Sequence, residues 1–203
     1  MAHAVEPPEP LVVHFDGLCQ PMNPGGIACY GFVVRQAGEV LRAEHGLVGE
    51  PFSEDASSNS AEYGALVRAL TWLLDHGHAA RPVAVYGDSQ LVVEQVNGKY
   101  RVRSERLLPL WREARALADR FERLSLAWVP RAENAEADAL TEAAYAEAIE
   151  GNPEWMRRVT AFLATPQELA ALERRGLPTK PYMSRMDFLK AIKKDKEREK
   201  EIV

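Results

Sequence analysis

The stretch Leu11-Val-Val-His-Phe-Asp16-Gly17 decides how the rest of the chain is interpreted. A short apolar run of this length is typical of a strand that is buried on both faces of a sheet. Asp16 then lies at or near the end of that strand, where the backbone leaves the sheet. Because a buried carboxylate is costly unless something positive shares its site, we expect a pair of divalent metal ions there.

The composition indicates one globular domain of ordinary size plus an appendage, because the chain has 203 residues, of which 46% are hydrophobic and 27% charged. No apolar run approaches the roughly 18 residues of a membrane span, and no signal-peptide pattern opens the sequence. Residues 1–10 are rich in Pro and Glu, and we expect them to be disordered. Cys19 and Cys29 have no CxxC or histidine partner, which favours buried thiols in a reduced, cytoplasmic protein.

Charge is distributed unevenly along the chain. Residues 1–150 hold 13 Lys and Arg against 22 Asp and Glu, whereas residues 151–203 hold 12 against 8. The change falls near Gly151-Asn152-Pro153, which is itself a turn signal. We therefore predict a globular domain over 11–150 and a basic, helical C-terminal extension over 151–203.

The hydrophobic periodicity predicts an α/β domain with the element order β-β-β-α-β-α-α-β-α. The predicted strands cover residues 12–15, 27–35, 39–48, 82–87 and 124–129. The predicted helices cover residues 61–76, from 88 or 89 to 96, from the end of a basic 99–106 loop to 123, and 133–150. Strands one, four and five are expected to be parallel, because crossover helices join them, and the first three antiparallel. The result is a five-stranded mixed sheet flanked by helices.

Four acidic residues lie at the boundaries of these elements: Asp16, Glu62, Asp88 and Asp138. Ligand sites in open sheets form at the carboxyl ends of parallel strands, so their convergence is geometrically reasonable. Each residue also has an ordinary interpretation when taken alone. Asp88 is equally well an N-cap. Glu62 lies in the first turn of its predicted helix, where it would complement the helix dipole. Asp138 would belong to a solvated helix face.

The sequences around these acids resemble type 1 ribonuclease H over about residues 11–148, with the element order intact. The motifs that carry the resemblance are Phe15-Asp16-Gly17 through Asn23-Pro24-Gly25-Gly26, Ser58-Asn59-Ser60-Ala61-Glu62, Tyr86-Gly87-Asp88-Ser89-Gln90, and Pro130-Arg131 through Glu133-Asn134 to Asp138. The stretch Asn97-Gly98-Lys99-Tyr100-Arg101-Val102 further resembles the compact, archaeal-like branch of that family.

The resemblance implies an endonuclease that hydrolyses the RNA strand of RNA–DNA hybrids and leaves 5′-phosphate and 3′-hydroxyl ends. It implies two Mg²⁺ ions, with Mn²⁺ as a substitute, and hard oxygen ligands suit both. By analogy Asp16 bridges both metals, Asp138 completes the water-activating site, and Glu62 with Asp88 completes the leaving-group site. Four neighbouring carboxylates cannot all ionise unless cations neutralise them, which agrees with this assignment.

Substrate contacts are expected from glycines that let the backbone approach a sugar and from polar groups that recognise a 2′-hydroxyl. The predicted substrate-binding residues are Gly17, Cys19, Asn23, Gly25, Gly26, Asn59, Ser89, Gln90, Lys99 and Arg101. Gly25-Gly26 also has the simpler interpretation of an ordinary turn.

The sequence departs from the better-known bacterial enzymes in two places. Asp88 and Asp138 are only 50 residues apart, which leaves little room for the basic protrusion that grips DNA in those enzymes. Lys99, Arg101, Arg103 and Arg106 would form a smaller basic patch, or simply a solvated loop. The second departure is Arg131, which lies where those enzymes place a histidine; we expect it to stabilise charge on the phosphate.

Three alternatives stay open. The same fold could act on other duplexes such as double-stranded RNA, or the domain could bind hybrids without cutting them. In the third, residues 151–203 recruit a protein partner or form a dimer contact through Trp155, Phe162 and Leu163. The net charge of +4 in this extension would instead help to hold a polyanionic substrate, mainly through residues 180–203.

Overall fold

The computed structural model describes residues 9–163 of the chain. Its elements are β1 (Leu11–Gln20), β2 (Ile27–Gln36), β3 (Glu39–Leu47), α1 (Ser58–Asp75), β4 (Pro82–Gly87), α2 (Gln90–Val96), α3 (Leu108–Ala118), β5 (Arg123–Trp128), a 3-10 turn η1 (Arg131–Glu133), α4 (Ala135–Gly151) and α5 (Pro153–Leu163). The predicted order of elements through α4 is confirmed. Residues 1–8 and 164–203 lie outside the described part. The predictions of disorder over most of residues 1–10 and of helices over most of residues 151–203 therefore fall outside it as well.

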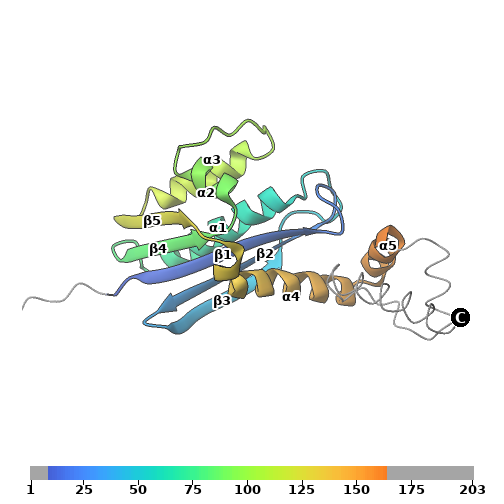
Figure 1. Cartoon of the computed structure of the whole chain (residues 1–203), viewed down its shortest axis with the longest axis horizontal. Coiled ribbons are helices and arrows are strands. Elements are labelled where there is room, and N and C mark those ends of the chain that lie inside the picture. Colours follow the sequence, from blue (N-terminus) through green and yellow to red (C-terminus); the bar gives the residue numbers. More distant parts are fainter. Residues whose placement is uncertain (1–8, 164–203) are drawn as a thin grey trace, which may run out of the picture. The chain divides into compact units, whose positions relative to one another are not determined.

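The sheet has the order β3-β2-β1-β4-β5, with β1 at its centre (Figure 1). β1 pairs antiparallel with β2, and β2 antiparallel with β3. On its other side β1 pairs parallel with β4, and β4 parallel with β5. This arrangement confirms the predicted five-stranded mixed sheet. It also places the carboxyl end of β1 beside that of β4, where the chemistry was expected.

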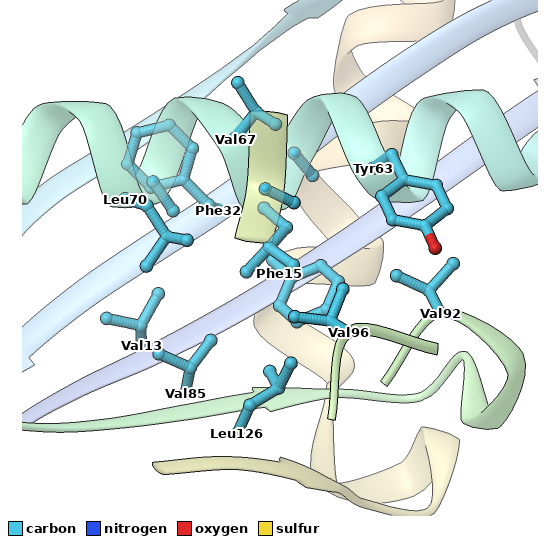
Figure 2. Packing of buried hydrophobic residues seen from close by; sticks show 14 of the residues in the cluster. Val13, Phe15, Phe32, Tyr63, Val67, Leu70, Val85, Val92, Val96 and Leu126 are labelled. Carbon is cyan, nitrogen blue, oxygen red and sulfur yellow. The ribbon is translucent and has the colours of Figure 1, made fainter. Parts of the chain in front are cut away.

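One face of the sheet packs on α1 and forms the main hydrophobic core. Val13 and Phe15 are fully buried there against α1, as are Val85 of β4 and Phe32 of β2. Figure 2 shows Phe15 close to the centre of this cluster. Side chains alternate along a strand, so His14 and Asp16 point to the opposite face.

That opposite face of β1 and β2 lies against α4. Asp16 pairs with Gly31 across the β1–β2 ladder, and paired residues share a face. A Cβ built on Gly31 would lie 2.7 Å from the Ala137 carbonyl oxygen and 2.7 Å from the Leu140 Cβ. The α4 backbone therefore approaches the sheet directly over Gly31, and beside it lies Asp16.

Several predicted boundaries are wrong, each for a local reason. β1 continues four residues past Asp16, because β2 goes on supplying backbone hydrogen bonds as far as the Gln20–Ile27 pair. α1 begins three residues early, at Ser58, because Ser57 and Ser60 form a capping box. Glu62 consequently lies in the second turn of the helix, not the first.

The end of α3 and the start of α4 also differ from the prediction. α3 ends at Ala118, because Arg123 already pairs with Pro82 as the first residue of β5. The last helix starts at Ala135, since Arg131–Glu133 form the separate turn η1.

The chain divides into two compact units between Ala144 and Tyr145, a point inside α4. The first unit contains the whole sheet. In the second unit the Asn152 side chain accepts hydrogen bonds from the Glu154 and Trp155 amides and so begins α5. The predicted boundary near Gly151 stays a prediction. Within residues 9–163, none of the helices combines the length and the apolar character that crossing a bilayer requires.

The approach of α4 over Gly31 generates a prediction. Gly31→Ala places a methyl group against the α4 backbone, so we expect the free energy of unfolding to fall by about 1–3 kcal/mol. Gly151→Ala is the matched control, because a Cβ at Gly151 meets nothing within 4 Å. Thermal unfolding followed by circular dichroism measures both variants. Equal midpoints for Gly31→Ala and the parent chain would contradict this account of the α4 contact.

Candidate active site

Asp16 lies where the parallel part of the sheet ends. The β1–β4 pairing stops at Phe15 and Gly87, so the residues that follow, Asp16 and Asp88, leave this ladder together. Asp16 is still within β1, because the antiparallel pairing with β2 continues, and it is 5% exposed. We expected the strand to end at or near Asp16. The pairing of β1 with β4 does end there, whereas the pairing of β1 with β2 continues to Gln20.

Gly17 brings α1 close enough for Glu62 to join Asp16. A Cβ on Gly17 would lie 2.1 Å from the Glu62 amide nitrogen and 2.4 Å from the Ala61 carbonyl carbon. Only a residue without a side chain permits this contact, because the clash would be with helix backbone. The structure therefore gives Gly17 a packing role, whereas the sequence predicted a substrate contact.

Asp88 completes a cluster of three carboxylates. One oxygen from each of Asp16, Glu62 and Asp88 lies within 4.8 Å of the others. Ser89, and not Asp88, is the N-cap of α2, and its side chain accepts a hydrogen bond from the Val92 amide. Asp88 is half-buried, and the capping interpretation offered by the sequence is wrong because Ser89 already satisfies the helix.

Burial and mutual repulsion oppose the ionisation of Asp16 and Glu62. Burial, then the charge of Asp88, raises the pKa of Asp16 to about 7. Burial and then the charge of Asp16 raise the pKa of Glu62 well above its ordinary value. The Oε2 atom of Glu62 is buried and has no hydrogen-bond partner among the described residues. Oxygen ligands, close spacing and an unpartnered buried oxygen fit a hard divalent cation.

Asp138, the fourth predicted carboxylate, lies outside this close group of three. It is on α4, and its amide donates to the carbonyl of Asn134. Its Oδ1 accepts a hydrogen bond from Arg131, and the two side chains form an ion pair. Arg131 comes from η1 and its side chain is 68% exposed. The structure therefore places Arg131 at the fourth carboxylate.

Two residues that the sequence analysis did not select as site residues connect α4 to β1. The Asn134 side-chain amide donates to the Phe15 carbonyl oxygen over 2.9 Å, in a buried contact. The Thr141 hydroxyl lies 3.0 Å from Oδ2 of Asp16. A signal for Thr141 did exist, since it is a polar residue in an alanine-rich helix, three positions after Asp138.

The predicted substrate loop is held by its own side chains. The Cys19 thiol is buried and contacts the carbonyl oxygens of Met22 and Ala56, at 3.2 and 3.4 Å. The Asn23 side chain donates to the Ser58 hydroxyl and accepts from the Ser58 amide. Cys19 and Asn23 thus connect the loop to the start of α1. A ligand contact through the Cys19 thiol does not fit its burial.

The turn needs glycine at both loop positions, for a different reason at each. Gly25 has a φ of +96°, which favours glycine, and its amide donates to the Ala56 carbonyl oxygen. A Cβ on Gly26 would lie 2.4 Å from the carbonyl oxygens of Gln20 and Met22. Both positions therefore need glycine for the turn itself, which is the simpler of the two interpretations of Gly25-Gly26.

The other predicted substrate residues lie at the surface. Asn59 is half-buried and lines a groove of about 990 Å³ between the start of α1 and the loop before α3. Gln90 is exposed and Ser89 half-buried at the start of α2, next to Asp88.

Two of the four cations in the predicted basic patch form ion pairs with acids of this chain. Lys99 pairs with Glu94 at 2.9 Å, and Arg106 pairs with Glu54 at 2.6 Å. Arg101 and Arg103 are exposed, and neither forms an ion pair within residues 9–163. Two cations of the predicted basic patch are therefore available to a polyanion, and two are already neutralised.

Comparison with known proteins gives the family. The family model described as "Reverse transcriptase-like" matches residues 16–144. The bifunctional protein Rv2228c of Mycobacterium tuberculosis is 40% identical over 132 residues, which are 64% of this chain and 34% of that protein. The chain therefore spans about a third of the length of this curated relative. Ribonuclease HI of Halobacterium salinarum is 34% identical over 135 residues, 66% of this chain and 64% of the relative.

Solved structures agree with this family. The N-terminal RNase H domain of Rv2228c from Mycobacterium tuberculosis superposes with a TM-score of 0.62 and 38% identity, covering 70% of this chain and 98% of that one. LC11-RNase H1, solved in complex with an RNA/DNA hybrid, has a TM-score of 0.61 and 31% identity, covering 68% and 99%. The chain therefore belongs to the reverse transcriptase-like family and, within it, to the type 1 ribonucleases H.

Proposed function

We propose that the protein is a metal-dependent endonuclease that hydrolyses the RNA strand of RNA–DNA hybrids. The observation that carries the proposal is the close group of Asp16, Glu62 and Asp88, with one buried carboxylate oxygen left without a partner. The relatives named ribonuclease HI and RNase H1, one of them solved with an RNA/DNA hybrid, support the choice of substrate.

The four carboxylates would hold two divalent cations, Mg²⁺ or in its place Mn²⁺. Asp16 is central, since it lies in the close group and also receives the hydrogen bond from α4. Bound cations of this kind supply a more acidic water and stabilise charge on an in-line phosphoryl displacement. The expected products are a 5′-phosphate and a 3′-hydroxyl.

The chain's own residues would orient the substrate around that centre. Arg131 is exposed at the edge of the site, and its guanidinium can pair with a phosphate oxygen as it now pairs with Asp138. Asn59 at the start of α1 and Gln90 at the start of α2 would accept or donate at the sugar. Contact with its 2′-hydroxyl is how an RNA strand is told from DNA. Arg101 and Arg103 would hold the duplex through its phosphates.

The preference for hybrids is tested by one gel. We expect cleavage of the labelled RNA–DNA hybrid with Mg²⁺ or Mn²⁺, none with a chelator, and none of double-stranded RNA, double-stranded DNA or single strands. Asp88→Asn should lower the rate at least about 100-fold, because it removes one charged group from the site. Asp75→Asn, the same change at an exposed position at the end of α1, is the matched control.

The outcomes of the gel separate the alternatives. Cleavage of double-stranded RNA at a comparable rate would identify a different duplex substrate. Hybrid binding without cleavage in any metal would identify an idle binding module. If the chain neither binds nor cleaves nucleic acid, the remaining alternative is an interaction protein that acts through residues 151–203.

A second prediction uses the protonation of Asp16. Its folded-state pKa of about 7 lies above the ordinary value of 3.8, so ionisation destabilises the metal-free fold as pH rises between these values. Bound Mg²⁺ would remove that cost. Mg²⁺ should therefore raise the thermal midpoint more at about pH 8 than at about pH 5.

Thermal unfolding with Mg²⁺ and with chelator at both pH values measures the difference. Asp16→Asn should show a smaller dependence on pH, since its amide does not titrate. Equal Mg²⁺ shifts at the two pH values would show that the metal does not bind at the ionised cluster.

A third prediction concerns Arg131. Arg131→Ala should lower turnover at least about tenfold, because the phosphate loses a charged hydrogen-bond donor. Arg35→Ala is the matched control, since Arg35 also pairs with an acid of α4, Glu136, at 2.5 Å. If steady-state kinetics show equal losses in the two variants, Arg131 acts by holding α4 and not on the substrate.

A further inference from the structure

We propose that Thr141 is a positioning residue for the Asp16 carboxylate, and that it sets the affinity of the cluster for divalent metal. This inference rests on the proposed function, because it concerns the same metal site. It assigns a role to a residue outside the four acids and outside the substrate-contacting set.

The geometry ties the Thr141 hydroxyl to the site. Thr141 is fully buried, and its Oγ1 lies 3.0 Å from Oδ2 of Asp16. The same Oγ1 lies 2.8 Å from the carbonyl oxygen of Asp138. A hydroxyl has one proton and can donate to one acceptor at a time. The ionised carboxylate is the stronger acceptor, so it takes the bond when Asp16 is charged.

The Thr141 hydroxyl donates a buried hydrogen bond to the Asp16 side chain, and this bond favours the charged carboxylate. The Asp16 carboxylate also has acidic neighbours, because one of its oxygens lies within 4.8 Å of oxygens of Glu62 and Asp88. Repulsion by neighbouring acids would turn a free carboxylate away from them. The bond from Thr141 fixes Oδ2 toward α4 and so limits the orientations of the carboxylate plane.

The helix that carries Thr141 is itself held at this distance. Gly31 lets the α4 backbone approach β2, and a Cβ there would lie 3.0 Å from the Thr141 amide nitrogen. The Asn134 amide bonds the carbonyl of Phe15, the residue before Asp16. One hydrogen bond from the residue before α4 and one from α4 itself therefore reach consecutive residues of β1. The hydroxyl is positioned by backbone packing, not by a flexible side chain.

The composition of α4 supports a specific role for this hydroxyl. Seven of the 17 residues of α4 are alanines, and alanine would fill a buried helical position without any polar group. A buried hydroxyl is costly unless it finds an acceptor, and here it finds a carboxylate. Groups that orient a metal ligand commonly change metal affinity by tenfold or more when removed.

The test compares Thr141→Val with Thr141→Ser. Valine keeps the shape and removes the hydroxyl, whereas serine keeps the hydroxyl and removes the methyl group. We expect Thr141→Val to raise the dissociation constant for Mn²⁺ about tenfold, and Thr141→Ser to bind nearly as the parent chain does. Calorimetric titration of the metal-free full chain with Mn²⁺ measures the affinity independently of nuclease activity.

Thr160→Val is the matched control. Thr160 is also a buried helical threonine, but its hydroxyl donates to the backbone carbonyl of Met156. Its variant should bind Mn²⁺ as the parent chain does. Thermal midpoints in chelator compare folding in all four proteins, and if Thr141→Val does not fold, Thr141→Ser and Thr141→Ala provide the comparison.

The outcomes separate this inference from the proposed function. If the parent chain binds no Mn²⁺, the metal-dependent function itself fails. If the parent binds Mn²⁺ and Thr141→Val binds it equally well or more tightly, only the role of Thr141 is overturned. An equal loss in Thr141→Val and Thr141→Ser overturns it as well, because packing and not the hydroxyl would then set the affinity.

Discussion

The mutual repulsion of three carboxylates in a low-dielectric site is the constraint on which the rest of the structure depends. Asp16 and Glu62 are buried and Asp88 is half-buried, yet their oxygens lie within 4.8 Å of one another. Such a group would separate if it were free to do so. It stays together because the hydrophobic core around Phe15 holds β1, β4 and α1 in place, and the acids are attached to that core. The repulsion among the acids that the core thereby maintains is what a bound cation would relieve.

Alternation along β1 connects the core to the chemistry. Phe15 points into the core beneath α1, and the next residue, Asp16, faces α4 on the opposite side. Gly17 then admits the α1 backbone, so that Glu62 reaches the site from the core side. Three consecutive residues thus contribute in turn to the core, to the acidic cluster and to the close approach of α1. A shift of one residue in the register of β1 would exchange the core residue for the acid.

Arg131 and Thr141 belong to the α4 side of the site, and they act on different acids. Arg131 neutralises Asp138 at the surface, where solvent and substrate can compete for the guanidinium. Thr141 contacts Asp16 in a buried position, where a single hydrogen bond to a charge is strong. The exposed pair suits a group that exchanges partners during a reaction. The buried contact suits a group that stays in place.

The sequence by itself determined the family, the order of elements and the three acids that lie close together, Asp16, Glu62 and Asp88. These depend on local periodicity and on motifs that are contiguous in the chain. It did not determine that Gly17 and Gly31 admit helix backbones, that Cys19 and Asn23 hold their own loop, or that Thr141 bonds Asp16. Those facts join residues that are between 3 and 125 positions apart. Only the tertiary structure decides them, since a side chain's partner across the fold depends on packing and not on the residues beside it.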